Sequence, residues 1–275
     1  MTISFHKMHG LGNDFVVLDL RQQVFPIDSK TVIQIADRNT GIGCDQVLVL
    51  RQPQSKHQLA SFEIWNSNGS QAEQCGNGVR CLGLYLKKCN ETPDGDFLLG
   101  GPAGEVKIQC LDGGQVKVNM GAPIFDNDQI PSSLQSDNGW FPIEIEQNEY
   151  LIGTVSMGNP HALVVVNDIK TADISHLGAI ISQLAAFPEG CNAGFAEIVD
   201  QNNILLRVYE RGSAETLACG SGACAAMSIL RKANLVSDTV NVTQSGGDLI
   251  ISWNGGEKPV MMTGPATHVF EGIFT

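Results

Sequence analysis

Two cysteines of the 275-residue sequence stand in closely matched surroundings. Cys75 begins the segment Cys-Gly-Asn-Gly, and Cys219 begins the segment Cys-Gly-Ser-Gly. The residues that follow each segment have the composition of a helix that ends in two basic residues. A cysteine at a helix N-terminus lies near unpaired backbone N–H groups and the positive end of the helix dipole, so we expect its pKa to be lowered. Both thiols are therefore candidates for acid–base chemistry.

The glycines beside these cysteines indicate what the thiols would act on. They expose backbone N–H groups that can bind a carboxylate. If both helix N-termini meet at one cleft, a carboxylate held there has one sulfur on each face of its α-carbon. One thiolate can then remove the α-proton while the other thiol delivers a proton from the opposite side. Backbone donors would stabilise the developing charge, so no pyridoxal cofactor is needed.

Two other interpretations of the cysteines remain open. Buried cysteines beside glycine-rich helix starts would look similar, although a matched pair is harder to explain in that way. A Cys75–Cys219 disulfide is chemically possible, either in catalysis or on oxidation without substrate, but thiol redox enzymes usually hold both cysteines within one turn. We expect the other six cysteines to be packing residues. No Cys/His cluster has zinc-finger spacing, so no metal is predicted.

The elements that position the two cysteines form an internal repeat. At the 144-residue offset that sets Cys75 over Cys219, Phe62–Asn66 lies over Leu206–Glu210, and both segments alternate as strands do. At an offset of 146, Gly12-Asn13 matches Gly158-Asn159, and Cys44-Asp45-Gln46 lies over Gly190-Cys191-Asn192. Further strands are predicted over Phe15–Leu20 and Ala162–Val166, and helices over Val79–Lys88 and Ala223–Lys232. The repeat predicts two similar α+β halves.

Glycine and proline mark the boundaries between these halves. Met120–Ile124 and Gly264-Pro265 each interrupt strand-like sequence. We therefore predict a first domain over residues 1–120, to which residues 266–275 return, and a second domain over residues 121–265.

Composition narrows the class of protein further. The chain is 43% hydrophobic, which supports a real core, and its net charge of −12 argues against a nucleic-acid partner. No apolar run is long enough to span a bilayer, and the first residues do not resemble a signal peptide. We expect a cytoplasmic protein that binds a small molecule and neither nucleic acid nor membrane.

The sequence closely resembles the diaminopimelate epimerase family over essentially its whole length. The motifs that carry this resemblance are Met8–Phe15, Gly41–Gln46, Asn66–Ser70, Glu73–Gly78, Gly158–His161, Glu210–Gly212 and Ala218–Ala223. The resemblance implies epimerisation of LL- to meso-2,6-diaminopimelate, in lysine and cell-wall precursor biosynthesis, without cofactor or metal. It also implies a homodimer and two pseudo-symmetric α+β domains, each a mixed, barrel-like sheet around a central helix.

The resemblance also assigns roles to individual residues. It implies that Cys75 and Cys219 are the two acid–base residues and that His161 and Glu210 modulate their protonation. The substrate-contacting positions are Asn13, Gln46, Asn66, Gly76, Asn77, Asn159, Asn192, Glu210, Arg211, Gly220 and Ser221. Backbone at Gly76-Asn77 and Gly220-Ser221 would cradle the α-carboxylate. Amides and one arginine are suited to a substrate with two ammonium and two carboxylate groups.

Three places depart mildly from the family pattern. In the stretch Glu210–Ala218, relatives more often have Ala-Gly after the first glycine and Gln before the last alanine. Ser221 replaces a frequent threonine, which leaves backbone donation unchanged. Phe270 stands where many relatives have a tyrosine at the dimer contact, so the hydroxyl is missing there.

Two alternative functions remain beside this one. A related two-cysteine racemase of proline or hydroxyproline would share the architecture, but its substrate lacks the distal group that Asn66, Asn159, Asn192 and Arg211 would bind. A non-catalytic binding protein on the same fold would not require two matched cysteines.

Overall fold

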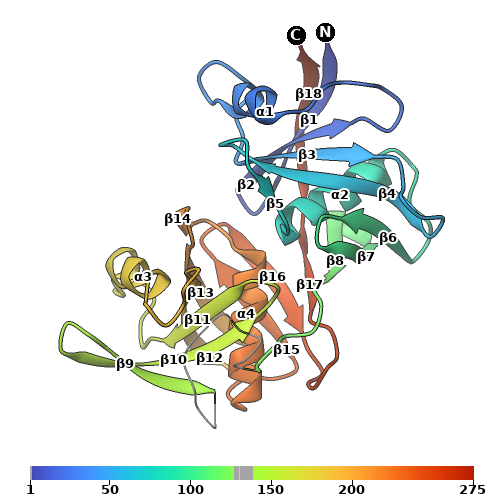
Figure 1. Cartoon of the computed structure of the whole chain (residues 1–275). Coiled ribbons are helices and arrows are strands. Elements are labelled where there is room, and N and C mark those ends of the chain that lie inside the picture. The colour runs from blue at the N-terminus through green and yellow to red at the C-terminus, as the bar shows by residue number, and fades with distance from the viewer. Residues whose placement is uncertain (1, 127–129, 131–138) are drawn as a thin grey trace. The chain divides into compact units, whose positions relative to one another are not determined.

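The computed structural model describes residues 2–126, 130 and 139–275, and they form two compact units. Unit 1 comprises Met1–Asn119 and Thr263–Thr275, and unit 2 comprises Met120–Met262. Each is a mixed sheet with few helices, which confirms the predicted α+β class (Figure 1). Among the described residues, no helix has both the length and the apolar character needed to span a membrane.

Unit 1 contains two helices, and its strands precede, separate and follow them along the chain. Its helices are α1 (Ser29–Ala36) and α2 (Gly76–Lys88), with a short 3-10 turn at Asp112–Gly114. Its strands are β1 (Ile3–Gly10), β2 (Asn13–Asp19), β3 (Gln46–Arg51), β4 (Gln58–Asn66), β5 (Gln71–Ala72), β6 (Asp96–Gly101), β7 (Gly104–Cys110), β8 (Gln115–Asn119) and β18 (Thr267–Phe274). Strand β17 (Met261–Pro265) leads into β18, which pairs antiparallel with β1.

Unit 2 repeats this order of elements. Its helices are α3 (Ile174–Ser182) and α4 (Gly220–Lys232). Its strands are β9 (Trp140–Ile145), β10 (Asn148–Ser156), β11 (Pro160–Val165), β12 (Asn192–Asp200), β13 (Asn203–Glu210), β14 (Ala214–Thr216), β15 (Thr239–Gln244) and β16 (Gly247–Ser252). Helix α4 contacts β10, β11, β12, β13, β15 and β16, so the strands of this unit surround it.

Strand pairing confirms the internal repeat. The parallel pair β2–β3 aligns Phe15 with Gln46, and the parallel pair β11–β12 aligns His161 with Asn192, 146 residues further on in both strands. The antiparallel pairs β4–β5 and β13–β14 keep the 144-residue offset in the same way. Each half then continues with a parallel pair and an antiparallel hairpin.

Helices α2 and α4 are each 13 residues long and begin earlier than their sequence predicts. We expected them from Val79 and Ala223, but they start at Gly76 and Gly220. Glycine is a poor helix former, and the early start is possible because a cysteine side chain caps each first turn. Both helices end in two basic residues, as the helix dipole favours.

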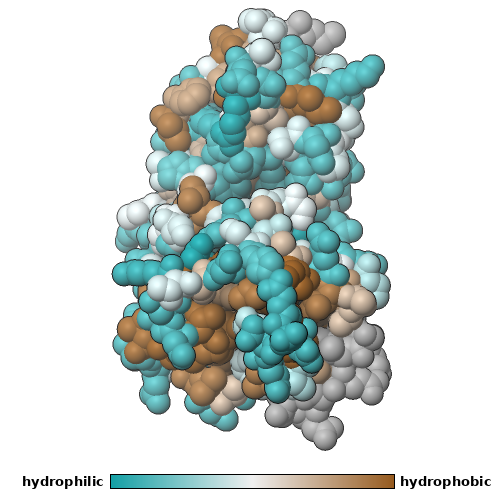
Figure 2. Space-filling view, turned by 90° about the vertical axis from the view of Figure 1, so that its left-hand side faces the viewer, coloured by the Kyte–Doolittle hydropathy of each residue, from teal (hydrophilic) through white to brown (hydrophobic). Residues whose placement is uncertain are grey.

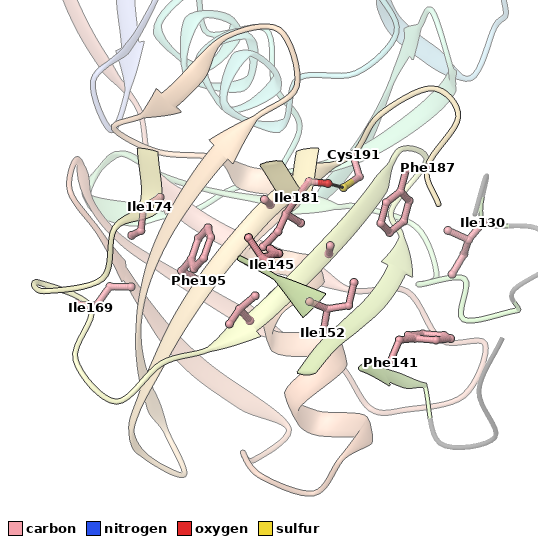
Figure 3. Close-up of a cluster of buried hydrophobic side chains, with 13 residues drawn as sticks. Ile130, Phe141, Ile145, Ile152, Ile169, Ile174, Ile181, Phe187, Cys191 and Phe195 are labelled. Atoms are coloured by element: carbon pink, nitrogen blue, oxygen red, sulfur yellow. Dashed lines mark hydrogen bonds between the residues drawn. The ribbon is translucent and has the colours of Figure 1, made fainter. Parts of the chain in front are cut away.

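The core of unit 2 fills the space between its strands and α3. Its buried members include Phe141, Ile152, Ile181, Phe187 and Phe195 (Figure 3). In unit 1, Val16, Leu18, Ile35, Val47 and Val49 form the corresponding cluster beside α1. These cores hold the ends of β2, β3, β11 and β12 in place, where several candidate site residues lie.

The cysteines outside the two motifs are not uniform. Four of them, Cys44, Cys81, Cys191 and Cys224, are buried and pack as predicted. Cys110 is half-buried and Cys89 is exposed, so the prediction of a packing role is wrong for Cys89. Burial raises the pKa of Cys44 and of Cys191 to about 12, which keeps both thiols protonated and inert.

Exposed apolar side chains occur on both units. In unit 2 they include Leu151, Val165 and Leu235, which also border a shallow depression with Trp140 and Tyr150. Figure 2 shows hydrophobic surface gathered over unit 2 on the face turned to the viewer. None of the predicted site residues lines that depression.

Candidate active-site residues

The two motif cysteines occupy the same structural position in their units. Each is the N-cap residue of its helix, in extended backbone conformation. The backbone N–H of Gly78 donates to Cys75 Sγ at 3.4 Å, and that of Gly222 donates to Cys219 Sγ at 3.4 Å. Both sulfurs therefore face the first turn of a helix, where N–H groups have no intrahelical partner.

In unit 1, Cys75 lies beside two amides from the predicted site. The Cys75 thiol donates to Asn13 Oδ1 at 3.8 Å, and Asn77 Nδ2 donates to the same oxygen at 3.2 Å. Asn13 begins β2 just after the β1–β2 turn, and Asn77 lies in the first turn of α2. The fold thus brings Asn13, Cys75 and Asn77 together, although Asn13 is more than 60 residues away in sequence.

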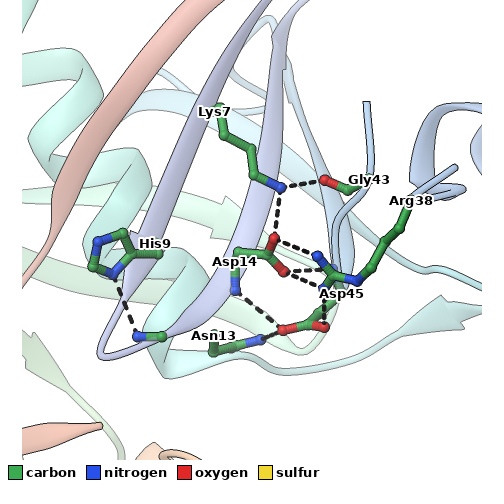
Figure 4. A network of polar contacts seen from close by, with 8 residues as sticks. Lys7, His9, Asn13, Asp14, Arg38, Gly43 and Asp45 are labelled. Carbon is green, nitrogen blue, oxygen red and sulfur yellow. Dashed lines mark hydrogen bonds and ion pairs between the residues drawn. The ribbon is translucent and has the colours of Figure 1, made fainter. Parts of the chain in front are cut away.

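Asp45 fixes which end of the Asn13 amide faces the cysteine. Asn13 Nδ2 donates to Asp45 Oδ2 at 2.9 Å (Figure 4). Asn13 Oδ1 is left turned toward Cys75 and Asn77. Asp45 in turn is held by Arg38, whose Nη2 lies 2.8 Å from both Asp45 Oδ1 and Asp14 Oδ1. The amide orientation of Asn13 is therefore set by a carboxylate that is itself anchored.

Asp14 is the centre of this polar network. It accepts from Arg38 and from Lys7 Nζ, the latter at 2.6 Å, and Lys7 also contacts the Gly43 carbonyl. Burial alone would raise the pKa of Asp14, but the hydrogen bonds from Arg38 and Lys7 hold it well below its usual range. The network ties β1, β2 and the loop before β3 into one rigid support for Asn13.

Gln46 and Asn66 lie side by side on paired strands. They are opposite each other in the β3–β4 register, and Gln46 Nε2 donates to Asn66 Oδ1 at 2.9 Å. Asn66 Nδ2 donates to Ser70 Oγ at 3.0 Å. Gln46 Oε1 is buried and has no hydrogen-bond partner among the described residues. Such an acceptor is costly to leave unpaired, so it favours a ligand with an N–H donor.

Arg80 is a completely buried arginine on α2. Its Nη1 donates to Asn77 Oδ1 at 2.9 Å, and its Nε donates to the Pro265 carbonyl at 3.2 Å. Asn77 is thus held at both ends, by Arg80 at the oxygen and by Asn13 at the nitrogen. A buried arginine with fixed partners restricts the first turn of α2 to one geometry.

In unit 2, Cys219 is buried and closely surrounded. Its backbone N–H donates to Gln244 Oε1 at 2.8 Å, and its sulfur lies 3.6 Å from Ser221 Oγ. Glu210 at the end of β13 also reaches the thiol, while Glu210 Oε1 accepts from Thr216 Oγ1 at 2.5 Å. The fold therefore brings Glu210, Cys219 and Ser221 together.

The protonation state of Cys219 differs from the expectation. We predicted a pKa lowered by the helix N-terminus, but burial raises it well above its ordinary value, and the charge of Glu210 raises it further. Hydrogen bonds from Ser221 and from the Gly222 N–H act in the opposite direction and are outweighed. The prediction is wrong for Cys219 because burial and a neighbouring carboxylate destabilise the thiolate more than the helix dipole stabilises it.

His161 and Asn159 form a second contact in unit 2. His161 Nε2 lies 3.0 Å from Asn159 Oδ1. Burial, together with the smaller effect of the nearby positive charge of Arg211, lowers the pKa of His161 to about 3. The imidazole is therefore neutral at neutral pH. Among the described residues, no hydrogen bond joins His161 to Cys219.

Asn192 and Arg211 meet at the ends of β12 and β13. The Arg211 backbone N–H donates to Asn192 Oδ1 at 3.0 Å, and Arg211 Nη1 donates to the Glu189 carbonyl at 2.8 Å. The Arg211 residue is exposed at the end of its strand. A guanidinium in this position is available to a carboxylate ligand.

Three positioning residues were not recognised in the sequence. They are Asp45, Arg80 and Gln244. Asp45 lies inside the Gly41–Gln46 motif and Arg80 lies two residues after Gly78, but nothing in their local pattern shows that they hold Asn13 and Asn77. Gln244 lies on β15, 25 residues after Cys219, and accepts the Cys219 N–H only because the fold brings the two segments together.

The fold defines a structural class. A probable proline racemase from Agrobacterium radiobacter has a TM-score of 0.72 at 15% identity, covering 98% of this chain and 92% of its own. A phenazine biosynthesis protein of the PhzF family from Bacillus anthracis has a TM-score of 0.69 at 15% identity, covering 100% and 99%. At such low identity these likenesses establish a shared fold, that of the epimerase, PhzF and proline racemase group.

Sequence comparison places the chain within this class. The family model for diaminopimelate epimerase matches residues 5–125 and 153–269. Diaminopimelate epimerase of Thioalkalivibrio sulfidiphilus is 46% identical over 275 residues, covering 99% of both chains. That of Xanthomonas axonopodis pv. citri is 45% identical over 271 residues, covering 98% of this chain and 95% of its own. The chain belongs to the diaminopimelate epimerase family.

Proposed function

We propose that this protein interconverts LL- and meso-2,6-diaminopimelate, with Cys75 and Cys219 as the acid–base pair and without a cofactor. The observation that carries this proposal is the matched capping of the two helices, in which each sulfur accepts an N–H at 3.4 Å. Family membership and the 144-residue repeat support the same assignment. Lysine and cell-wall precursor biosynthesis in the cytoplasm is the role that such a reaction would serve.

The proposed reaction is a balanced transfer of one proton in and one proton out. A thiolate takes the α-proton, the electron pair is delocalised onto the α-carboxylate, and a thiol on the opposite face returns a proton to the carbon. The enzyme is left with the two protonation states exchanged. Backbone N–H groups at Gly76-Asn77 and Gly220-Ser221 would stabilise the developing charge on the carboxylate oxygens. The reaction requires both half-sites to meet one substrate.

The raised pKa of Cys219 supports a division of roles at rest. With Cys219 protonated, it is the proton donor in the first half of the reaction, and Cys75 supplies the base. Glu210 reaches the same thiol, and its negative charge would favour the protonated form from which Cys219 donates to the α-carbon. His161, neutral because of its burial, would hold Asn159 rather than carry charge.

The polar residues around each cysteine suit a substrate with two amino-acid ends. Gln46 Oε1, buried without a partner among the described residues, would accept from an ammonium group. Asn66, Asn192 and Arg211 would bind the distal amino and carboxylate groups. Proline has no distal end, so we expect it to be a poor substrate.

The test is solvent-deuterium uptake at the α-carbon of LL-diaminopimelate, followed with no cofactor added. Wild type should incorporate deuterium and form the meso isomer. Cys75→Ser and Cys219→Ser keep an acceptor at the helix cap, and each should lose inversion by at least about 1,000-fold. Cys89→Ser, at an exposed cysteine outside the site, is the matched control and should retain full activity. Near-normal inversion in either site variant would refute the two-base mechanism.

We also propose a homodimer formed through β18. Val269, Phe270 and Ile273 on this strand expose 53%, 47% and 67% of their surface. Light scattering after size-exclusion chromatography would report the mass. Wild type should behave as a dimer and Ile273→Ser should shift it toward the monomer, whereas a monomeric wild type would refute the assignment.

A further inference from the structure

Two histidines and a glutamate far apart in sequence meet on the β1–β18 ladder of unit 1. They are His6 on β1 and His268 and Glu271 on β18. Each offers a ligand atom, and all three atoms lie within 4.8 Å of one another. No sequence spacing indicates this cluster, because 262 residues separate the two histidines.

A β-bulge produces the cluster. His6 is directly opposite Glu271, and Met8 is opposite His268, with the register shift between Lys7 and Met8. Side chains three residues apart on a regular strand point to opposite faces. The extra residue in β18 reverses that relation, so His268 and Glu271 emerge on the same face as His6. Bulges commonly redirect a side chain in this way.

The distances between the three atoms match a tetrahedral coordination shell. His6 Nδ1 lies 3.1 Å from His268 Nε2 and 3.4 Å from Glu271 Oε2, and His268 Nε2 lies 3.9 Å from the same oxygen. Zinc held by imidazole and carboxylate at about 2.0–2.1 Å requires ligand atoms about 3.4 Å from one another. We propose that His6, His268 and Glu271 form a binding site for a divalent transition-metal ion of the zinc type.

The surroundings of the cluster fit this assignment. Both imidazoles are mostly buried, and a neutral imidazole nitrogen is the form that binds a metal. The Tyr85 ring packs against His6 with its centroid 4.8 Å away. Tyr85 also donates to Asp19, and the negative charge of Asp19 favours positive charge at His6. The positive charge of Lys88 disfavours a cation at the two histidines, and the negative charge of the Glu271 carboxylate acts in the opposite direction.

The exposed side of the site leaves room for further ligands. The Glu271 side chain is 70% exposed, whereas those of His6 and His268 are 23% and 15% exposed. Water can therefore complete the coordination, as it does in zinc sites with three protein ligands. Because the ligands come from two paired strands, the ion would hold β18 to β1 and stabilise unit 1.

Cobalt(II) titration of the full-length protein tests the site and separates it from thiolate binding at Cys75 or Cys219. Nitrogen and oxygen ligands give weak visible bands, whereas thiolates add an intense charge-transfer band in the near ultraviolet. We expect one cobalt per chain with visible bands and without thiolate charge transfer. Zinc added in excess should raise the melting temperature of the wild type.

Three variants make the result specific. His268→Asn should weaken binding by roughly tenfold or more. Glu271→Gln changes an exposed side chain, so it should leave the metal-free melting temperature unchanged and abolish the rise with zinc. His176→Asn is the matched control, since His176 and Glu146 form a two-ligand pair 3.1 Å apart in unit 2. A spectrum dominated by thiolate, or equal binding by wild type, His268→Asn and Glu271→Gln, would overturn the proposal.

Discussion

Arg80 Nη1 donates to Asn77 Oδ1 at 2.9 Å from one turn further along the same helix. Asn77 passes this constraint on, because its Nδ2 donates to Asn13 Oδ1, the atom that also accepts from the Cys75 thiol. The environment of the sulfur thus depends on a buried guanidinium through Asn77 and Asn13.

Replacement of Arg80 should therefore reduce turnover. Arg80→Met leaves the Asn77 oxygen without its charged donor, at a cost of about 1–3 kcal/mol, and frees the amide to rotate. We expect kcat to fall at least about tenfold, with a lower melting temperature. Arg80→Lys restores charge without the planar fork and should recover part of kcat. Arg231→Met, in an exposed ion pair on α4, is the control. Equal kcat in Arg80→Met and wild type would contradict the positioning role.

Asp45 and Arg38 allow the orientation of Asn13 to be tested separately from the ion pair. Asp45→Asn removes the carboxylate that receives Asn13 Nδ2, so the Asn13 amide can flip and present nitrogen to Cys75. We expect a loss of kcat/KM of about tenfold with little change in melting temperature, because Asp45 is exposed. Arg38→Gln breaks the same ion pair but keeps the Asn13–Asp45 hydrogen bond. If both variants lose activity equally, the ion pair and not the amide orientation matters.

Glu210 should control the ionisation of Cys219. The carboxylate raises the pKa of this thiol, so Glu210→Gln should lower it. Alkylation of Cys219 by iodoacetamide, followed by mass spectrometry across a pH series, reports the thiolate fraction. The profile of Glu210→Gln should move to lower pH than that of wild type. Glu144→Gln, an exposed carboxylate on β9 in the same unit, should leave it unchanged. Coincident profiles for Glu210→Gln and wild type would exclude this effect.

His161 should make unit 2 sensitive to acid. Its pKa is about 3 when folded, against 6.5 as the ordinary value, so the unfolded chain binds a proton that the folded chain does not. Stability from this group is complete above pH 6.5 and is lost as the pH falls toward 3, by up to about 1.4 kcal/mol per pH unit. His161→Phe introduces the residue found at the equivalent position of unit 1, Phe15, and should flatten that slope in urea unfolding. Parallel stability curves for the two proteins would contradict the assignment.

The local elements were predictable because their signals lie within short stretches of chain. Alternating residues identified strands that the structure places in β4 and β13, and composition identified α2 and α4. The repeat was visible because its offsets of 144 and 146 survive in strand register. The start of each helix was predicted three residues late, since sulfur capping is not part of ordinary helix propensity.

The protonation state of Cys219 and the residues that position the site were not predictable in the same way. The pKa of Cys219 depends on burial and on Glu210, which both raise it. Tertiary packing decides whether these two effects outweigh the lowering of the pKa by the helix dipole. Asp45, Arg80 and Gln244 were missed because each acts through a partner chosen by the fold. The roles of the predicted substrate-binding residues stay predictions until variants of them are assayed.

The pairing of β1 with β18 also sets an order for biosynthesis. The sheet of unit 1 uses residues 3–10 and residues 267–274, while unit 2 is one continuous stretch, Met120–Met262 (Figure 1). As the chain leaves the ribosome, unit 2 can form its complete set of contacts while β1, already paired with β2, still lacks β18 on its other edge. The half of the protein that is synthesised first is therefore the half that is completed last, and until then the free edge of β1 needs protection from other chains.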